Sequence, residues 1–202
     1  MIKSAIFDLG GVYFTDGARI AIGKISRKFN LHPEFVEKAL EFNSELGMLY
    51  RKGEITAEEF WDRAKKFLGI DADNDYLNKI WMGSYKPIRG TIEIIKQLKK
   101  RNIKLFLLSD NVKERTEYLQ AKYNFLEDFI DSIFSYEVHK MKSDGTAIFK
   151  LAIDKTGDKP ENIVFIDDKE EFVKTAKKAG MNVIRFKNPK QLEEEFKNLG
   201  IL

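Results

Sequence analysis

The amino-acid sequence predicts a doubly wound α/β protein, with a parallel five-stranded sheet and an inserted helical subdomain. Five short runs of apolar and β-branched residues are the first indication, and helical patterns separate the last four of them. The runs are continuous rather than alternating, as expected for parallel strands that are covered on both faces. A long helical stretch between the first and second runs is the third indication. Together these features favour a layered α/β core with one large insertion.

The expected strands span residues 4–8, 104–109, 132–135, 163–167 and 182–186. Between two of these runs, Ile92, Ile95 and Leu98 recur at helical spacing and form one apolar face. Gly157 and Gly180 each stand just before a strand, where a helix C-terminus favours a residue that tolerates the left-handed conformation. The sequence therefore alternates strand and helix through its second half.

The insertion accounts for the distance between the first two strands. About ninety residues separate them, far more than a crossover helix requires. We therefore expect an α/β core at 1–14 and 87–202 and a helical subdomain at 15–86. Within this subdomain Thr56 and Glu59 match a capping box, and Pro33 favours the first turn of a helix at 34–43.

Composition excludes several classes of protein. With 43% hydrophobic and 33% charged residues the chain is globular rather than disordered. It contains no cysteine, which excludes a disulfide framework, thiolate catalysis and cysteine-rich zinc sites. No apolar run approaches the roughly eighteen residues of a membrane span, and Asp8 comes before any signal-like segment can form. We expect a soluble cytoplasmic protein with no membrane partner.

The charge pattern gives no indication of nucleic-acid binding. The net charge of +3 arises from 35 basic and 32 acidic residues that are mixed along the predicted helices. Charged runs such as 96–101 and 191–195 lack interleaved aromatic residues that would stack on bases, so we interpret them as solvated helix faces. The sequence leaves the oligomeric state open.

Acidic residues follow two of the predicted strands. Asp8 ends the run Ile6-Phe7 and precedes Gly10 and Gly11, while Asp167 and Asp168 end the run at 163–167. A lone aspartate at a strand end is usually a turn or helix cap. Three at the carboxyl edge of one parallel sheet are expected to lie close together, at the edge where such sheets bind ligands. Clustered carboxylates repel one another unless a cation lies among them, and Mg²⁺ prefers oxygen ligands of this kind.

Two further polar segments are expected at the same edge of the sheet. Ser109, Asp110 and Asn111 follow the second strand, and Lys142 lies on a loop after the third. Together with the acidic residues, they resemble the four ordered motifs of the haloacid dehalogenase superfamily of hydrolases. The resemblance covers the whole core and implies that the insertion at 15–86 is a mobile helical cap. The form Asp-Leu-Gly-Gly-Val at 8–12 is similar to a branch that includes sugar-phosphate phosphatases.

The resemblance implies a role for each acidic residue. Asp8 matches the nucleophile, which attacks phosphorus and forms an aspartyl-phosphate that water hydrolyses. The implied Mg²⁺ ligands are the carboxylate of Asp8, the main-chain carbonyl of Gly10 and the carboxylate of Asp168, with Asp167 nearby or acting through water. A carbonyl ligand requires no side chain, so Gly10 can serve although most relatives have aspartate there.

The remaining motif residues are matched to phosphate binding. Ser109 matches the hydroxyl that hydrogen-bonds a phosphate oxygen, and backbone N–H groups of Asp110 and Asn111 are expected to add donors. Taken alone, Ser109 is more typical of a helix N-cap, and both roles can coexist. Lys142 matches the lysine that neutralises nucleophile and phosphate, with Lys140 as the competing choice.

Two positions depart from the family pattern. Gly10 replaces a second aspartate that protonates the leaving group and later activates water, help that is typically worth about 10²- to 10⁴-fold in rate. Phe172 replaces an asparagine that could orient the metal ligands. We interpret the other prominent residues as structural: His32, His139, Trp61 and Trp81. Met48, Tyr50 and Arg51 could face either the substrate or the interior of the cap.

The leading hypothesis is a Mg²⁺-dependent phosphatase of a small phosphorylated metabolite, such as a sugar phosphate, acting through Asp8. A metal-independent 2-haloacid dehalogenase is the second, because such enzymes use the first aspartate and lack the one that Gly10 replaces. The Asp167-Asp168 pair argues against it, since dehalogenation requires no metal. The third is a catalytically weakened protein that binds a phosphorylated ligand and acts in regulation, as Gly10 and Phe172 would suggest.

Overall fold

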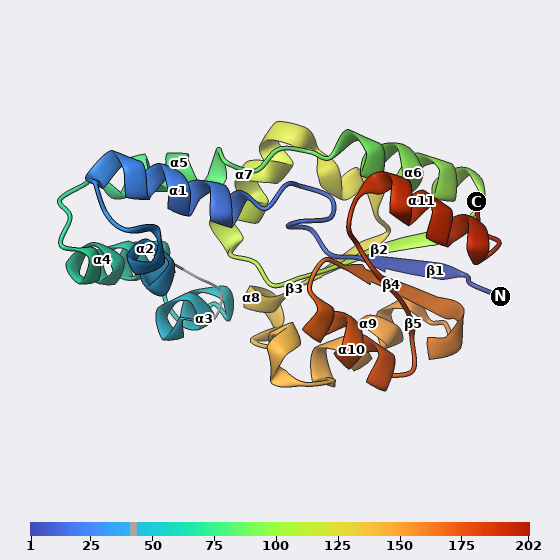
Figure 1. The fold of residues 1–202 in the computed structure, drawn as a ribbon. Coiled ribbons are helices and arrows are strands. Elements are labelled where there is room, and N and C mark those ends of the chain that lie inside the picture. Colours follow the sequence, from blue (N-terminus) through green and yellow to red (C-terminus); the bar gives the residue numbers. More distant parts are fainter. Residues whose placement is uncertain (41–43) are drawn as a thin grey trace.

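The structure, a computed structural model, describes residues 1–40 and 44–202. Its core is one parallel sheet with strand order β3-β2-β1-β4-β5 (Figure 1). The strands are β1 (Ser4–Phe7), β2 (Lys104–Ser109), β3 (Asp131–Phe134), β4 (Ile163–Asp167) and β5 (Asn182–Arg185). All five predicted strands are present, and their bounds agree with the predicted ranges to within one residue. The Rossmann-like α/β class predicted from the apolar runs is thereby confirmed.

Helices cover both faces of the sheet, and Figure 1 shows α6 and α11 on one side and α9 and α10 on the other. The core helices are α6 (Arg89–Lys100), α7 (Lys113–Tyr123), α8 (Ser135–Val138), α9 (Ala147–Thr156), α10 (Glu170–Lys178) and α11 (Pro189–Asn198). Successive residues of β1 point to opposite faces, so that Phe7 packs with Leu98 and Phe196 while Ile6 packs with Phe149 and Ala176. Burial on both faces explains why these strands are continuously apolar.

Local signals in the sequence set the ends of several elements. Ile95 and Leu98 of α6 are buried as their spacing predicts, whereas Ile92 is half-buried. The capping box is present, since the Thr56 hydroxyl accepts from the Glu59 N–H and the Glu59 carboxylate accepts from the Thr56 N–H. Gly157 and Gly180 have positive φ at helix ends, as predicted.

The insertion between β1 and β2 forms a helical subdomain at one end of the sheet (Figure 1). Its helices are α1 (Gly17–Phe29), α2 (Pro33–Leu40), α3 (Glu45–Arg51), α4 (Ala57–Leu68) and α5 (Asn74–Met82). The predicted helix at 34–43 begins one residue earlier, at Pro33, and the last three of its residues lie outside the described part of the chain. Trp61 and Trp81 are buried and pack edge to face with ring centroids 5.3 Å apart. Their interpretation as structural residues is confirmed.

Two chain segments join the helical subdomain to the sheet and pair with each other. The Thr15 N–H donates to the Lys86 carbonyl at 2.8 Å, and the Ile88 N–H donates to the Tyr13 carbonyl at 2.8 Å. The two crossings therefore lie side by side, as expected for an insertion into one loop. Within the described ranges, no helix is both long enough and apolar enough to span a bilayer.

Strand order and register bring the predicted site together. Phe7 of β1 pairs with Leu107 of β2 and with Ile166 of β4, so Asp8, Ser109 and Asp167 all lie at the same carboxyl edge. The chain winds outward from β1 to β3 in one direction and from β4 to β5 in the other. This reversal of strand order is the position at which open α/β sheets bind ligands.

Candidate active site

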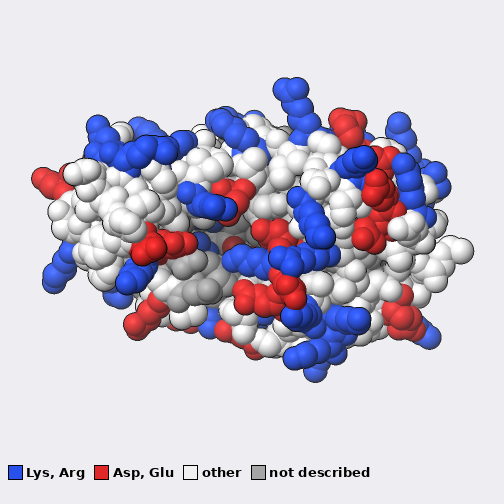
Figure 2. All heavy atoms as spheres, in the orientation of Figure 1, with Lys and Arg blue, Asp and Glu red and all other residues white. Residues whose placement is uncertain are grey.

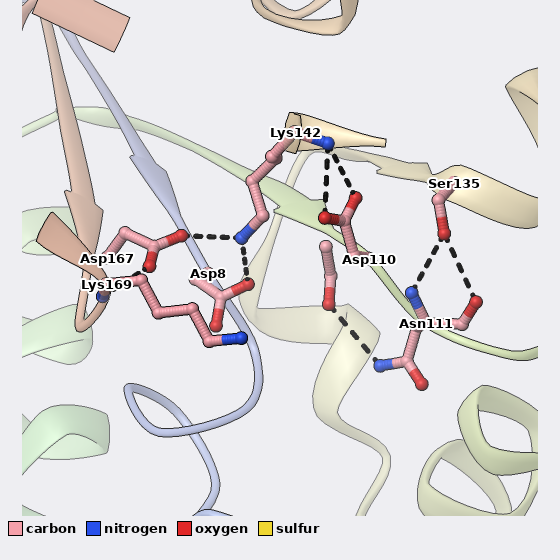
Figure 3. A network of polar contacts seen from close by, with 8 residues as sticks. Asp8, Asp110, Asn111, Ser135, Lys142, Asp167 and Lys169 are labelled. Atoms are coloured by element: carbon pink, nitrogen blue, oxygen red, sulfur yellow. Dashed lines mark hydrogen bonds and ion pairs between the residues drawn. The ribbon is translucent and has the colours of Figure 1, made fainter. Parts of the chain in front are cut away.

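Lys142 joins the nucleophile candidate to the acidic motif. Its ammonium donates to Asp8 Oδ1 at 2.6 Å and to Asp167 Oδ2 at 2.5 Å, and all three side chains are buried (Figure 3). The Asp167 carboxylate is held in place from behind, because its Oδ1 accepts the Lys169 N–H at 2.8 Å. One cation thus contacts two carboxylates from neighbouring strands.

The third carboxylate completes a compact oxygen cluster. One oxygen each from Asp8, Asp167 and Asp168 lies within 4.8 Å of the others. Gly11 permits this arrangement, because it has φ +90° and a Cβ at this position would lie 2.6 Å from Asp168 Oδ2. Gly11 therefore allows the backbone to approach an acidic side chain closely.

The charges of the cluster are unbalanced without a further cation. Burial raises the pKa of Asp8 to about 8, and the neighbouring Asp167 and Asp168 add to the rise although Lys142 opposes it. Burial and then Asp167 raise the pKa of Asp168 to about 6. Burial alone would lower the pKa of Lys142, but the carboxylates of Asp167 and Asp8 raise it overall, so this lysine stays charged. A divalent cation among the three carboxylates would favour their ionised forms.

Gly10 offers a backbone oxygen at the same place. It lines the cavity that contains Asp8 and Asp168, and its carbonyl accepts none of the backbone hydrogen bonds found among the described residues. Carboxylate and carbonyl oxygens are the ligands that Mg²⁺ prefers, with water and substrate oxygens filling the remaining positions. The residues therefore fit the predicted metal, which Asp8, Gly10, Asp168 and Asp167 could hold.

The structure distinguishes the two candidate lysines. Lys142 is buried between the carboxylates, whereas Lys140 is exposed and does not line the cavity. Phe172, at the position where the resemblance implies an asparagine, is buried with its ring centroid 4.8 Å from Lys142 Nζ. The ring contacts the lysine through a cation–π interaction in place of a hydrogen bond to the acidic motif.

Ser109 ends β2 beside the cluster and is buried in the cavity wall. Its alternative role as a helix N-cap is wrong, because α7 begins at Lys113 after Val112 and no side-chain cap bond is present there. The intervening loop is held away from helical geometry by Ser135, whose Oγ accepts the Asn111 N–H at 3.0 Å (Figure 3). The Ser109 hydroxyl therefore does not cap a helix and can face a ligand.

Asp110 and Asn111 make contacts different from those expected. Both carboxylate oxygens of Asp110 accept the Lys142 N–H, at 3.0 and 3.1 Å, which fixes the lysine loop (Figure 3). The Asn111 N–H is occupied by Ser135, and the Asn111 side chain donates to Ser109 Oγ at 3.4 Å. These two residues thus position Lys142 and Ser109, and their binding of substrate stays a prediction.

The site opens into a cavity of about 210 Å³ between the sheet edge and the helical subdomain. Figure 2 shows acidic and basic side chains side by side near the centre of the molecular face that is also seen in Figure 1. The sequence did not single out Arg115 and Tyr85, which line the cavity together with Arg51. Arg115 lies four residues after Asn111 within the charged run 113–115, a pattern typical of a solvated helix face.

The three uncertain cap residues, all on α3, have different environments. Arg51 lines the cavity, whereas Met48 does not. Tyr50 is buried against Phe60, with ring centroids 4.5 Å apart, and its hydroxyl donates to Glu114 on α7 at 2.8 Å. Of the three, only Arg51 is placed to meet a ligand.

Comparison with known proteins assigns the family. The family model of the haloacid dehalogenase-like hydrolases matches residues 2–180, which includes every residue of the site described above. The chain belongs to this hydrolase family. The resemblance predicted from the four motifs is confirmed.

Two named relatives are phosphatases. The chain is 31% identical over 97 residues to enolase-phosphatase E1 of Persephonella marina, a match that covers 47% of this chain and 42% of the relative. It is 21% identical over 180 residues to the sesquiterpene phosphatase astK of Aspergillus oryzae, covering 89% of this chain and 87% of the relative. The chain spans only 60% and 42% of the length of the first two curated relatives that it matches.

A solved structure of similar fold contains the expected ions. The chain resembles a haloacid dehalogenase family enzyme of Bacteroides thetaiotaomicron in complex with magnesium and inorganic phosphate, with a TM-score of 0.75. The sequences are 23% identical, and the match covers 93% of this chain and 96% of that one. This likeness confirms the α/β fold.

Proposed function

We propose that this protein is a Mg²⁺-dependent phosphatase of a small phosphorylated metabolite, acting through an aspartyl-phosphate on Asp8. One observation carries the proposal: the Lys142 ammonium lies between Asp8 and Asp167, with Asp168 completing the oxygen cluster in a cavity. The same set of residues offers a nucleophile, a fixed positive charge and ligands for a hard cation. The family and the phosphatases among its relatives support this reading.

The chain's own residues suffice for most of the reaction. An Asp8 oxygen attacks the phosphorus, the bond from phosphorus to the leaving oxygen breaks, and the electron pair leaves with that oxygen. Lys142 opposes the charge on Asp8 and on the phosphoryl oxygens, and the Ser109 hydroxyl can donate to one of those oxygens. Water then attacks the phosphorus, the bond between phosphorus and the Asp8 oxygen breaks with its electron pair returning to the carboxylate, and the protons of the water leave on the inorganic phosphate or pass to solvent. Bound Mg²⁺ would supply charge neutralisation to the cluster and to the transferred group.

Gly10 bears on the choice of substrate. With no carboxylic acid at this position, the leaving oxygen must depart as an anion or take its proton from water. We therefore propose substrates with a stable leaving anion, such as anomeric sugar phosphates, acyl phosphates or aryl phosphates. Screening phosphorylated metabolites with Mg²⁺ would identify the compound.

The decisive experiment measures p-nitrophenyl phosphate hydrolysis with Mg²⁺. We expect turnover by the natural sequence and a loss of about 10³-fold or more in Asp8→Asn, since removing a nucleophile abolishes the reaction path. Asp131→Asn is the matched control, because Asp131 lies at the exposed start of β3 and pairs with Lys155. An Asp8→Asn variant as active as this control would overturn the proposal.

The two other functions considered give different results in the same assays. Chloride release from a 2-haloacid that persists in the presence of a chelator would support dehalogenation. That reaction does not require the three-carboxylate cluster. Binding of phosphate with Mg²⁺ but no turnover of any ester would support a regulatory ligand-binding protein, for which Gly10 and Phe172 are the motivation.

A further inference from the structure

Arg115 is a buried cation in the cavity wall that the proposed chemistry does not use. It lies on α7, only 3% of it is exposed, and it lines the same cavity as Asp8 and Ser109. Its guanidinium packs on the rings of Trp81, on α5, and Tyr85, three residues after that helix. The guanidinium carbon lies 4.6 Å from the Trp81 ring centroid and 4.8 Å from the Tyr85 ring centroid. These rings, together with Asn111, fix the plane of the guanidinium.

One edge of this guanidinium lacks a partner. Arg115 Nη1 donates to Asn111 Oδ1 at 3.1 Å, but Nε and Nη2 are buried and have no hydrogen-bond partner among the described residues. No described carboxylate lies within ion-pairing distance of Arg115 either. A buried charge with unsatisfied donors is costly unless an anion completes the site. Nε and Nη2 are parallel donors on one edge, the geometry that binds a carboxylate or phosphate through two hydrogen bonds.

A second arginine reaches the same cavity from the helical subdomain. Arg51 ends α3, is 3% exposed and lines the cavity, and its Nη1 donates to the Gly47 carbonyl at 3.1 Å. Burial and then the charge of Arg115 lower the pKa of Arg51 to about 10. An anion near both guanidinium groups would oppose this repulsion and would lie between the core and the helical subdomain.

We propose that Arg115 and Arg51 form a second anion subsite, which binds a carboxylate or a second phosphate on the non-reacting part of the substrate. This substrate class rests on the proposed phosphatase function. Tyr85 supports a subsite distinct from the reacting phosphate, because its ring contacts Arg115 on one side and lies 3.8 Å from the position that a Cβ of residue 10 would occupy. Asn111 connects the two places, accepting from Arg115 and donating to Ser109.

The test compares pairs of esters that differ only in the second charge. The first pair is 4-carboxyphenyl phosphate and phenyl phosphate, and the second is glucose 1,6-bisphosphate and glucose 1-phosphate, so that every reacting ester belongs to the proposed aryl or anomeric class. We expect kcat/KM with Mg²⁺ to be about tenfold or more higher for the doubly anionic member of at least one pair, as two charge-assisted hydrogen bonds imply. The pair that responds distinguishes a carboxylate from a phosphate, and no preference in either pair would overturn the subsite.

Arg115→Lys tests the residue itself, since lysine keeps the charge but lacks the two-donor edge. The selectivity ratio within the responding pair should fall about tenfold. Arg19→Lys is the control, because Arg19 is an exposed arginine at the rim of the same cavity, and its ratio should not change. A ratio that is unchanged in Arg115→Lys, or an equal loss for both members of the pair, would contradict the proposal.

A binding measurement separates this inference from the proposed function. Thermal denaturation of Asp8→Asn with each of the four esters requires no turnover. A larger shift of the melting temperature with the doubly anionic member of a pair, lost when Arg115→Lys is added, would support the subsite even if no ester were hydrolysed. Equal shifts from all four esters would reject it even if p-nitrophenyl phosphate were a substrate.

Discussion

Gly10 and Gly11 follow the same aspartate but differ in what surrounds them. A Cβ at residue 10 would meet only Tyr85 Cε1, at an ordinary contact distance of 3.8 Å. A Cβ at residue 11 would lie 2.6 Å from Asp168 Oδ2, at a positive φ that disfavours side chains. Gly11 is thus required by the packing of the acidic motif, whereas Gly10 leaves room for the missing acid.

Gly10→Asp should restore general acid catalysis. We expect kcat/KM for alkyl phosphates to rise, by up to about 10²- to 10⁴-fold, and to rise less for aryl phosphates whose leaving groups need no proton. The measurement is a plot of log kcat/KM against leaving-group pKa, which should be steep in the natural sequence and flatter in the variant. A slope that is already flat in the natural sequence would remove the basis of this prediction.

Gly11→Ala is the matched control for that substitution. It adds less volume than aspartate but displaces Asp168, so we expect activity to fall for every substrate and the Mg²⁺ concentration needed for half-maximal rate to rise. If both glycine variants behaved alike, the difference in their surroundings would have no functional consequence.

The proximity of the site residues at strand ends could be predicted from the sequence, because strand order and register alone bring these residues together. Asp8, Asp167 and Ser109 needed only the knowledge that the carboxyl ends of parallel strands meet. Arg115 could not be predicted in this way, since its surroundings depend on Trp81 and Tyr85, some thirty residues earlier in the chain. The residues next to it in the sequence are charged, which is typical of a solvent-exposed helix face.

At the level of elements, the two loops after β2 and β3 are held together by Asp110. Its carboxylate accepts the Lys142 N–H, and burial raises its pKa from 3.8 to about 6 although Lys142 opposes the rise. The local sequence by itself predicts a helix N-cap at Ser109, because a serine followed by acidic residues is a good N-cap. In the structure the Asn111 N–H donates to Ser135 Oγ instead, and the helix begins only at Lys113.

The raised pKa of Asp110 predicts a pH-dependent stability. The folded state binds the proton more tightly than the unfolded state, so the free energy of unfolding should fall as pH rises from about 4 to about 6 and stay lower above that. Asp110→Asn removes this loss and keeps an oxygen for the Lys142 N–H. The variant should therefore be more stable than the natural sequence above pH 6, by about 1 to 3 kcal/mol given partial exposure, with the difference vanishing near pH 4. Urea denaturation without Mg²⁺ between pH 4 and 8 measures it.

Asp144→Asn, in the lysine loop after β3, is the control with the opposite sign. Burial alone would raise the pKa of Asp144, but the Met141 N–H and the Lys52 ammonium lower it overall. The carboxylate therefore stabilises the fold above its pKa, and its removal should reduce the free energy of unfolding at neutral pH. A gain in stability from both variants would show that their charge states do not determine the effect.

At the scale of the whole molecule, α3 fastens the helical subdomain to the core. Ser135 Oγ donates to the Arg51 carbonyl at 2.6 Å, and His139 Nδ1 lies 2.7 Å from the Lys52 carbonyl. These contacts and the Tyr50–Glu114 hydrogen bond join the subdomain to the core separately from the paired crossings at Thr15 and Lys86. Two chain segments connect the subdomain to the core, and a few polar side-chain contacts of α3 join it to the core elsewhere. Loss of these polar contacts would allow the subdomain to rotate away from the core about the two segments.

The chain permits a direct measurement of this motion. It contains no cysteine, so two introduced cysteines can carry spin labels without background. Glu58 on α4 and Lys150 on α9 are exposed positions in the helical subdomain and the core, and Glu194 on α11 is an exposed core position. Distances between labels at 58 and 150 report the movement of the subdomain, and those between 150 and 194 report the core alone.

We expect the distance distribution between labels at 58 and 150 to be broad in the free protein and to narrow when Mg²⁺ and inorganic phosphate are added together. Inorganic phosphate can bind at the subsite of Arg115 and Arg51 as well as beside Asp8. It is predicted to favour the state in which Arg51 and the cavity wall are assembled, because only that state brings both arginines to the anion. The distribution between 150 and 194 should not change. A distribution between 58 and 150 that is equally narrow with and without the ligands would show that the subdomain is fixed, and that substrate enters through the existing cavity opening.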